Sequence, residues 1–339
     1  MRLIKTEDAV GHVLCHDMTQ IIKDQYKDAR FRKGHVVTEE DIPVLLSMGK
    51  EHLYVWEMTP GMVHENDAAE RLLALCGQEN MIRSGVKEGK IELKAACDGV
   101  FLVDSARLVA VNSQDEVMIA TRKGGMAVRE GDKLAGMRVI PLIIEEEKLR
   151  KAEQAAGDKP LLSLKPYVRK TACIVATGGE VKKGLIKDTF TPVVIDKLKT
   201  YGIETLEVVY SGDGVENVRD AVLAMREKKP DMILCTGGMS VDPDDNTPGG
   251  IKAAGANIIA YGAPVLPGAM FLLGYFDDGM PVMGLPGCVM YVGATVFDLV
   301  LPKIAADVPV TRADIAALGE GGLCLGCKPC HYPICPFGK

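Results

Sequence analysis

The sequence predicts an α/β protein, with a mostly parallel sheet in its second half and a smaller β-rich α+β region before it. From about residue 171 onward, short apolar runs alternate with segments of helical spacing, which indicates a parallel sheet covered on both faces. Between residues 90 and 144, short alternating segments are separated by Asp-Gly and Gly-Asp turns, a pattern typical of a small β-rich domain.

Composition limits the class of protein. The 339 residues suffice for two or three domains with a sizeable core. The net charge of −6 argues against a general nucleic-acid binder, which needs a basic face. The longest apolar stretch, residues 288–304, is broken by Gly293, Asp298 and Pro302, and no secretory signal begins the chain. We therefore expect a cytoplasmic protein with neither a membrane nor a nucleic-acid partner.

The first half predicts several elements in order. Residues 38–48 have the pattern of a capped helix that ends at Gly49, with a strand after it, and residues 67–78 predict a second helix. The segments KIELKA, GVFLVD, RLVAVN and EVMIAT and the run from AVREGD to VIPLII predict strands, and the charged segment after them predicts a helix and a linker. The expected divisions are an α+β segment (1–65), a β-rich domain (66–150), a linker (151–170), an α/β domain (171–310) and a cysteine-rich tail (311–339).

The second half predicts alternating strands and helices. The expected strands are CIVAT, TLEVVY, MILCT and PVMGL. The expected helices are TPVVIDKLKTYG, with Pro192 near its start and Gly202 at its end, ENVRDAVLAMREKK, and a long apolar helix from Cys288.

Each of these strands ends in glycine or acid: TGGE, YSGDG, CTGGMSVDPDDNT and GLPG. Ligands of parallel sheets bind at the carboxyl ends of strands, and backbone N–H groups of glycine turns bind oxyanions. Asp242, Asp244 and Asp245 would repel a phosphate unless a cation lay between them, a role suited to Mg²⁺. The alternative is that these residues only shape solvated turns. The convergence of four such loops on one edge favours a ligand site.

These motifs, in this order, resemble the molybdopterin-binding domain shared by molybdopterin adenylyltransferases and molybdopterin molybdenumtransferases, over about residues 170–305. The resemblance implies a three-layer α/β/α domain that binds the pterin phosphate with Mg²⁺. It places catalytic acids at Glu180, Asp188, Asp213 and Asp245, with Asp213 and Asp245 as Mg²⁺ ligands. It places ligand-binding positions at Thr177, Gly178, Gly179, Thr236, Gly237, Gly238, Ser240, Thr247, Pro286 and Gly287.

The chain departs from the family pattern in one loop that bears on chemistry. The transferases carry lysines on both sides of a Pro-Gly pair, where they could hold molybdate, whereas this chain has Leu266-Pro267-Gly268-Ala269. Two other motifs change as well, to Asp188-Thr189-Phe190 and to Leu285-Pro286-Gly287-Cys288-Val289. Pterin binding is therefore better supported than molybdate insertion.

The resemblance implies a molybdenumtransferase-like protein of molybdenum-cofactor biosynthesis. Its expected partners are molybdopterin or adenylylated molybdopterin, other molybdenum-cofactor proteins and further copies of itself. One alternative is a non-catalytic molybdopterin carrier or sensor. Another is a nucleotide pyrophosphatase, because PDDNT also resembles the Asp-Asp-x-Thr of the competence-damage-inducible family.

The C-terminus predicts a metal site. Cys324, Cys327 and Cys330 have the spacing C-x2-C-x2-C, and Cys335 follows with Pro336 after it. This is the cysteine run of bacterial ferredoxins with one extra residue, so a 4Fe-4S cluster is one expectation. Zinc is the other, because four thiolates, or three with His331, satisfy a tetrahedral ion. The remaining alternative is a mobile tail without metal.

Overall fold

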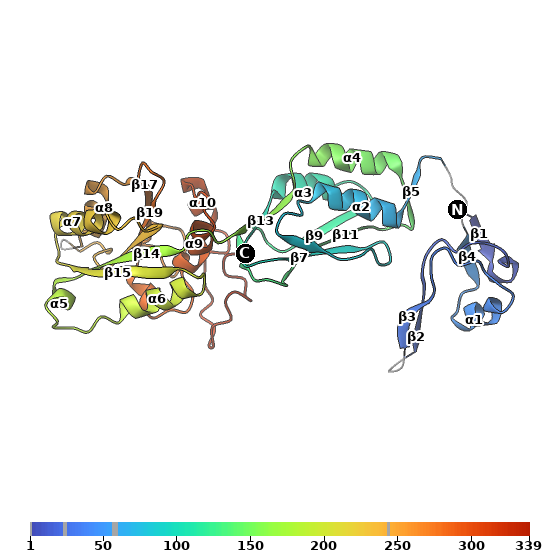
Figure 1. The fold of residues 1–339 in the computed structure, drawn as a ribbon, viewed down its shortest axis with the longest axis horizontal. Coiled ribbons are helices and arrows are strands. Elements are labelled where there is room, and N and C mark those ends of the chain that lie inside the picture. Colours follow the sequence, from blue (N-terminus) through green and yellow to red (C-terminus); the bar gives the residue numbers. More distant parts are fainter. Residues whose placement is uncertain (1, 23–25, 56–59, 243–244) are drawn as a thin grey trace. The chain divides into compact units, whose positions relative to one another are not determined.

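The computed structural model describes residues 2–22, 26–55, 60–242 and 245–339, and omits the side chains of Tyr26 and Glu180. The chain divides into two compact units (Figure 1). Unit 1 comprises residues 1–96, 103–124 and 131–163, and unit 2 comprises residues 97–102, 125–130 and 164–339. The finer division of the chain into five segments stays a prediction.

Unit 2 is built on a six-stranded sheet of order β15-β14-β16-β19-β18-β17. The first four strands of that order are parallel to one another. Strand β18 is antiparallel to both of its neighbours, β19 and β17, so the predicted mostly parallel sheet is confirmed. The strands are β14 (Thr171–Thr177), β15 (Glu204–Ser211), β16 (Met232–Thr236), β17 (Asn257–Tyr261), β18 (Leu272–Tyr275) and β19 (Pro281–Leu285).

Helices cover both faces of this sheet (Figure 1). On one face, α6 (Phe190–Lys199) and α9 (Val296–Ala305) pack in a cluster that includes Ile174 of β14. On the other face, α7 (Val215–Arg226) and α8 (Thr247–Ala253) pack with its neighbour Cys173. Because consecutive residues of a buried strand point to opposite faces, the apolar strands feed both layers. Three short elements also belong to unit 2: α5 (Gly179–Lys182), η2 (Gly287–Met290) and α10 (Arg312–Ala317).

The helix predicted from Cys288 begins later than expected. Residues 287–290 form η2 and helix α9 starts only at Val296, so this boundary is wrong. The Thr295 hydroxyl accepts from Phe297 N–H, and the Asp298 carboxylate accepts from Thr295 N–H at 2.8 Å. This capping box fixes the helix start. The apolar residues before it pack without being helical.

Unit 1 contains an antiparallel sheet of order β6-β7-β11-β9, two-stranded pairs β1-β4, β2-β3 and β5-β12, and four α-helices among its described residues. The strands are β1 (Arg2–Lys5), β2 (Met18–Ile22), β3 (Tyr26–Phe31), β4 (His52–Val55), β5 (Met62–His64), β6 (Met81–Arg83), β7 (Ile91–Ala95), β9 (Val117–Thr121), β11 (Lys133–Val139) and β12 (Ile143–Glu145). The helices are α1 (Asp41–Ser47), α2 (Glu65–Leu75), α3 (Ser105–Asn112) and α4 (Glu146–Ala156), with η1 (Thr6–Asp8) before them. A separate three-stranded sheet has the order β10-β8-β13, formed by β10 (Met126–Val128), β8 (Gly99–Val103) and β13 (Leu162–Pro166).

The β-rich character of this region is confirmed, with one error. The segment RLVAVN, predicted as a strand, lies in helix α3. The Asp104 carboxylate accepts from Arg107 N–H at 3.1 Å and so caps the helix N-terminus. A side-chain cap therefore overrides the β-propensity of the valines. In the part of the chain that the structure describes, no helix is both long and apolar enough to cross a bilayer, and the cytoplasmic location stays a prediction.

Candidate ligand site at the strand ends

The four parallel strands of unit 2 end side by side. Thr177 at the end of β14 pairs with Ser211 at the end of β15. Thr236 at the end of β16 pairs with Ala176 on one side and with Leu285, the last residue of β19, on the other. The loops TGGE, SGDG, TGGMSVD and LPG therefore leave the sheet at one edge, as the sequence predicted.

The first two loops are joined by a hydrogen bond from backbone to side chain. The Asp213 carboxylate accepts from Gly179 N–H at 3.0 Å. A Cβ at Gly179 would lie 2.7 Å from that carboxylate oxygen, which explains the glycine. The Lys182 side chain lies over Gly212, with Nζ 3.8 Å from where a Cβ of Gly212 would be. The first loop thus contacts the second through the hydrogen bond to Asp213 and through the Lys182 side chain beside Gly212.

The third loop is held by buried threonines. The Thr177 hydroxyl donates to the Thr236 carbonyl at 2.9 Å and lies 3.2 Å from the Thr247 hydroxyl, which bonds the Gly237 carbonyl at 2.9 Å. Thr236 and Thr247 are 2% and 1% exposed. The hydroxyls of Thr177 and Thr247 are therefore used inside the protein, and a ligand would meet the backbone of Gly237 and Gly238 instead. Ligand binding by the matched threonines stays a prediction.

Asp245 closes the same loop from its far side. Its carboxylate accepts from Ser240 N–H at 2.9 Å, and its own N–H donates to the Asp242 carbonyl at 2.9 Å. The Tyr261 hydroxyl donates to the Met239 carbonyl at 3.2 Å. Burial and the charge of Asp245 both raise the pKa of Tyr261. Sequence reasoning missed Tyr261, because it lies on a strand with no recognisable motif; Asp244 lies outside the described residues.

The remaining acids differ in what they do. Asp188 accepts from the N–H groups of Phe190 and Thr191 at 2.9 and 3.0 Å, at the start of α6. Burial alone would raise the pKa of Asp188, but hydrogen bonds from Thr191 and Phe190 outweigh it and the pKa is lowered. Glu180 lies in α5, with its side chain outside the described atoms. Asp188 therefore acts as a helix cap in this structure, and its catalytic role stays a prediction.

The Thr-Pro-Gly-Gly segment, expected to be part of a loop, forms the start of α8. A Cβ at Gly250 would lie 2.5 Å from Val218 Cβ, and a Cβ at Gly249 would lie 3.1 Å from Val215. These glycines allow α8 to pack closely against α7. They serve helix packing, which positions the loop before them.

A metal ion at the strand-end edge would need oxygen atoms from a bound phosphate in addition to those of the protein. Among the described side chains, no three His, Cys, Asp or Glu residues are grouped so that they could hold one ion. Mg²⁺ takes only one or two carboxylates and completes its shell with water and substrate phosphate. Asp213 and Asp245 each use a carboxylate oxygen to bind a backbone N–H. Mg²⁺ ligation by Asp213 and Asp245 stays a prediction.

The fourth loop leads from the strand ends to the tail. Pro286 precedes η2, and Gly287 is its first residue. Residues 291–294, which follow η2, line a cavity together with the tail. Cys324, Cys327, Cys330, Cys335 and His331 all line this cavity. Phe337 is 2% exposed and belongs to a core cluster of unit 2, so the end of the tail packs against the domain. Whether the tail holds a metal stays a prediction.

Comparison with known proteins agrees with the resemblance of unit 2 to a known family. Residues 173–306 match the family described as a probable molybdopterin binding domain. Residues 3–57 match a domain of unknown function, DUF8806.

Individual relatives are similar over shorter stretches. A CinA-like protein of Mycobacterium tuberculosis is 33% identical over 76 residues, which cover 22% of this chain and 18% of that protein. A CinA-like protein of Petrotoga mobilis is 32% identical over 76 residues, covering 22% and 19%. The chain thus spans less than about a fifth of the length of these curated relatives.

Solved structures resemble the same part of the chain. The molybdopterin biosynthesis enzyme MoaB from Thermus thermophilus has 16% identity and a TM-score of 0.36, covering 42% of this chain and 97% of that one. The protein CinA from Thermoplasma acidophilum has 18% identity and a TM-score of 0.35, covering 40% and 98%.

Proposed function

We propose that the strand-end edge of unit 2 binds molybdopterin, with Mg²⁺ bridging Asp213 and Asp245 to the pterin phosphate, and that the protein acts in molybdenum-cofactor biosynthesis. The observation that carries this proposal is the register of the four parallel strands, which brings all four glycine- and acid-bearing loops to one edge. The family match of residues 173–306 supports it.

The physical basis is charge balance at this edge. A phosphate beside two carboxylates is repelled by several kcal/mol at an effective dielectric of about 20 unless a cation separates them. Mg²⁺ can supply that charge while keeping most of its water. The Lys182 ammonium, which lies over the Gly212 backbone, would add a second positive charge.

The test is binding of molybdopterin to the full chain, with and without Mg²⁺. Asp245→Asn keeps an oxygen that can accept from Ser240 N–H but removes the charge, so we expect Mg²⁺-dependent affinity to fall about tenfold, on the order of 1.4 kcal/mol, with folding intact. Asp213→Asn should behave alike. Asp196→Asn is the control, because Asp196 is an exposed acid of α6 paired with Lys199.

Equal affinity in wild type and Asp245→Asn with Mg²⁺ present would refute the proposed site. Mass spectrometry of the ligand that copurifies with native protein separates the alternatives, since a nucleotide in place of a pterin would favour the pyrophosphatase. The pyrophosphatase remains an alternative because the chain is locally similar to CinA-like proteins.

A carrier is the second candidate, favoured by the loop that lacks the family lysines. The Leu266 N–H donates to the Gly322 carbonyl at 2.8 Å, and Cys324 N–H donates to the Leu266 carbonyl at 2.8 Å. The place of one expected lysine is thus an apolar residue whose backbone is paired with the tail. Inserting molybdate would place a second anion beside the phosphate with little positive charge to offset it.

We therefore expect weak or absent molybdate-dependent turnover of adenylylated molybdopterin, alongside measurable binding of the pterin. The measurement is turnover by wild type and by the triple change of Lys182, Lys183 and Lys187 to alanine. Robust wild-type turnover that this triple change abolishes would overturn the carrier and identify the first loop as the molybdate site.

A further inference from the structure

The C-terminal tail lines a second cavity in unit 2. This cavity, of about 300 Å³, lies between residues 291–294 and the last sixteen residues of the chain. All four tail cysteines line it. The six other cysteines of the chain do not. The cysteines that line the cavity are thus the same four that the sequence groups by the spacing C-x2-C-x2-C followed by a fourth cysteine.

The size of the cavity favours a cluster over a single ion. A tetrahedral zinc with sulfur ligands at ~2.3 Å brings its ligand sulfurs to within about 3.8 Å of one another. Such a site needs far less space than the cavity of about 300 Å³ that the four cysteines line. An iron–sulfur cluster binds each cysteine to a different part of a larger body, so its ligands stand around a cavity. We propose that this cavity holds an iron–sulfur cluster ligated by Cys324, Cys327, Cys330 and Cys335.

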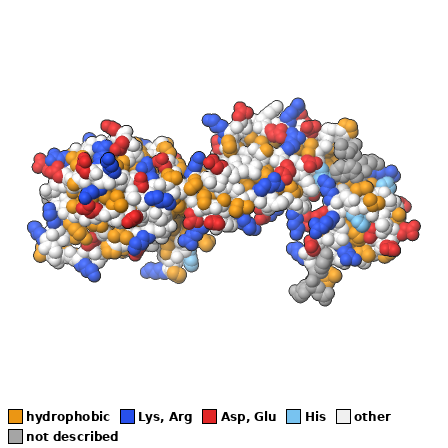
Figure 2. All heavy atoms as spheres, viewed as in Figure 1, with side chains coloured by type: hydrophobic (Ala, Val, Ile, Leu, Met, Phe, Trp, Pro, Cys, Tyr) orange, Lys and Arg blue, Asp and Glu red, His pale blue; other side chains and the backbone are white. Residues whose placement is uncertain are grey.

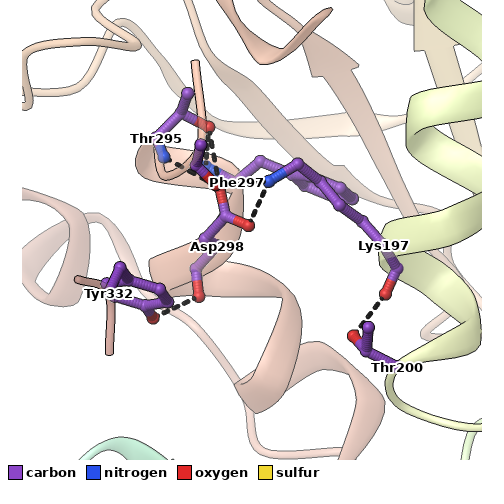
Figure 3. A network of polar contacts seen from close by, with 7 residues as sticks. Lys197, Thr200, Thr295, Phe297, Asp298 and Tyr332 are labelled. Atoms are coloured by element: carbon purple, nitrogen blue, oxygen red, sulfur yellow. Dashed lines mark hydrogen bonds and ion pairs between the residues drawn. The ribbon is translucent and has the colours of Figure 1, made fainter. Parts of the chain in front are cut away.

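Contacts that involve no cysteine side chain position the tail. The Tyr332 hydroxyl donates to the Asp298 carbonyl at 3.0 Å (Figure 3). The Asp298 carboxylate caps α9 and accepts from Lys197 Nζ at 2.5 Å (Figure 3). Phe337 is buried in the core, and Gly338 N–H donates to the Gly321 carbonyl at 2.9 Å. The cysteine segment is therefore anchored to α9 through Tyr332 and to the core through Phe337.

Residues 291–294 form the side of the cavity opposite the tail, and at Gly293 there is no room for a side chain. A Cβ at Gly293 would lie 3.0 Å from both Cβ and Sγ of Cys330. The Gly293 carbonyl accepts from Lys197 Nζ at 3.0 Å, which fixes this wall to α6. Residues 291–294 follow directly after η2. This short segment therefore connects the fourth strand-end loop to the proposed cluster cavity. The proposal does not depend on molybdopterin binding, because the two sites use different residues.

The test is anaerobic purification of the full chain, with iron, acid-labile sulfide and zinc measured together with visible absorption. We expect brown protein with about four iron and four sulfide ions per chain. Cys327→Ser and Cys330→Ser should each lose most of both. Cys97→Ser, a half-buried cysteine of unit 2 outside the cavity, should keep them. His331→Ala should keep them too, since the four cysteines complete the ligand set.

Three results would overturn the proposal: stoichiometric zinc without sulfide, protein with neither metal, or iron and sulfide retained in both cysteine variants. Loss of metal in His331→Ala would instead indicate a Cys3His ion. The urea midpoint of each variant is compared with that of wild type stripped of metal, so that misfolding is not mistaken for ligand loss. Gly293→Ala should lower the iron content, because its methyl group displaces Cys330.

Discussion

The strand-end edge and the cysteine cavity lie in the same unit but are held in different ways. The strand-end loops hold one another, through Asp213 with Gly179 and through Thr177 with Thr236 and Thr247. The cavity is held by the burial of Phe337 and by the hydrogen bond from Tyr332 to α9, and both residues also line it. The strand-end site is thus fixed by the pairing of the strands, whereas the tail site depends on two aromatic side chains of the tail itself.

The largest effect should come from removing the main anchor of the tail. Phe337→Ala should lower the free energy of unfolding by about 3–5 kcal/mol, the usual cost of a buried Phe→Ala change, measured by urea denaturation of the full chain. Iron content should fall with it, because the cysteine segment loses its support. Phe337→Leu, which keeps most of the apolar volume, is the milder control. Wild-type stability of Phe337→Ala would show that the tail is held by something else.

A smaller effect should come from the strand-end edge. Gly237 has φ +82°, and a Cβ there would lie 2.4 Å from the Thr177 carbonyl oxygen. Gly237→Ala should cost on the order of 1–3 kcal/mol, from backbone strain and this overlap, and should weaken molybdopterin binding. Iron content should not change, since Gly237 is not among the residues that line the tail cavity.

Gly131→Ala is a matched control for that change. Gly131 has φ +83° but nothing within 4 Å of a new Cβ. It should therefore show the backbone strain without the overlap. If Gly131→Ala costs as much as Gly237→Ala, the close approach to Thr177 contributes nothing, and the loop is less tightly held than the structure indicates.

The smallest effect concerns pH and the opposite edge of the same sheet. The Asp231 carboxylate accepts from the N–H groups of Lys170 and Thr171 at 2.6 and 2.9 Å. Burial alone would raise the pKa of Asp231, but these hydrogen bonds outweigh it and the pKa is lowered. A lowered folded-state pKa stabilises the protein above the unfolded value of 3.8 and loses that contribution as pH falls through the folded value.

Asp231→Asn should therefore destabilise the protein at pH 7 by at most about 1 kcal/mol after solvent screening, and the difference from wild type should vanish well below pH 3.8. The measurement is the urea midpoint across that range. A difference that stays constant down to the lowest pH would show that the charge of Asp231 contributes nothing and that its shape alone matters.

The surface agrees with the predicted absence of a nucleic-acid partner without testing it. Figure 2 shows basic and acidic side chains interspersed over the face of unit 2 that it presents. The prediction itself depends on the net charge of −6.

Much of unit 2 could be predicted from the sequence because strands and helices there alternate with strong signals. The apolar runs at 173–177 and 232–236 are buried strands, and Gly202 follows α6 as expected. Predictions failed where a side chain acted on the backbone. Asp104 made a helix of RLVAVN, and Thr295 with Asp298 moved the start of α9 from Cys288 to Val296. Hydrophobic periodicity does not record such caps.

The sequence by itself determined which residues carry the chemistry: the glycines and acids that end four strands, and four cysteines at fixed spacing. The tertiary structure decided what those residues can do. Asp188 accepts hydrogen bonds at the start of α6, and the hydroxyls of Thr177 and Thr247 form hydrogen bonds inside the protein. The tail cysteines line one cavity, because the burial of Phe337 in the core holds the tail against the domain. Local pattern specifies donors and acceptors, but only packing decides which of them remain available to a ligand.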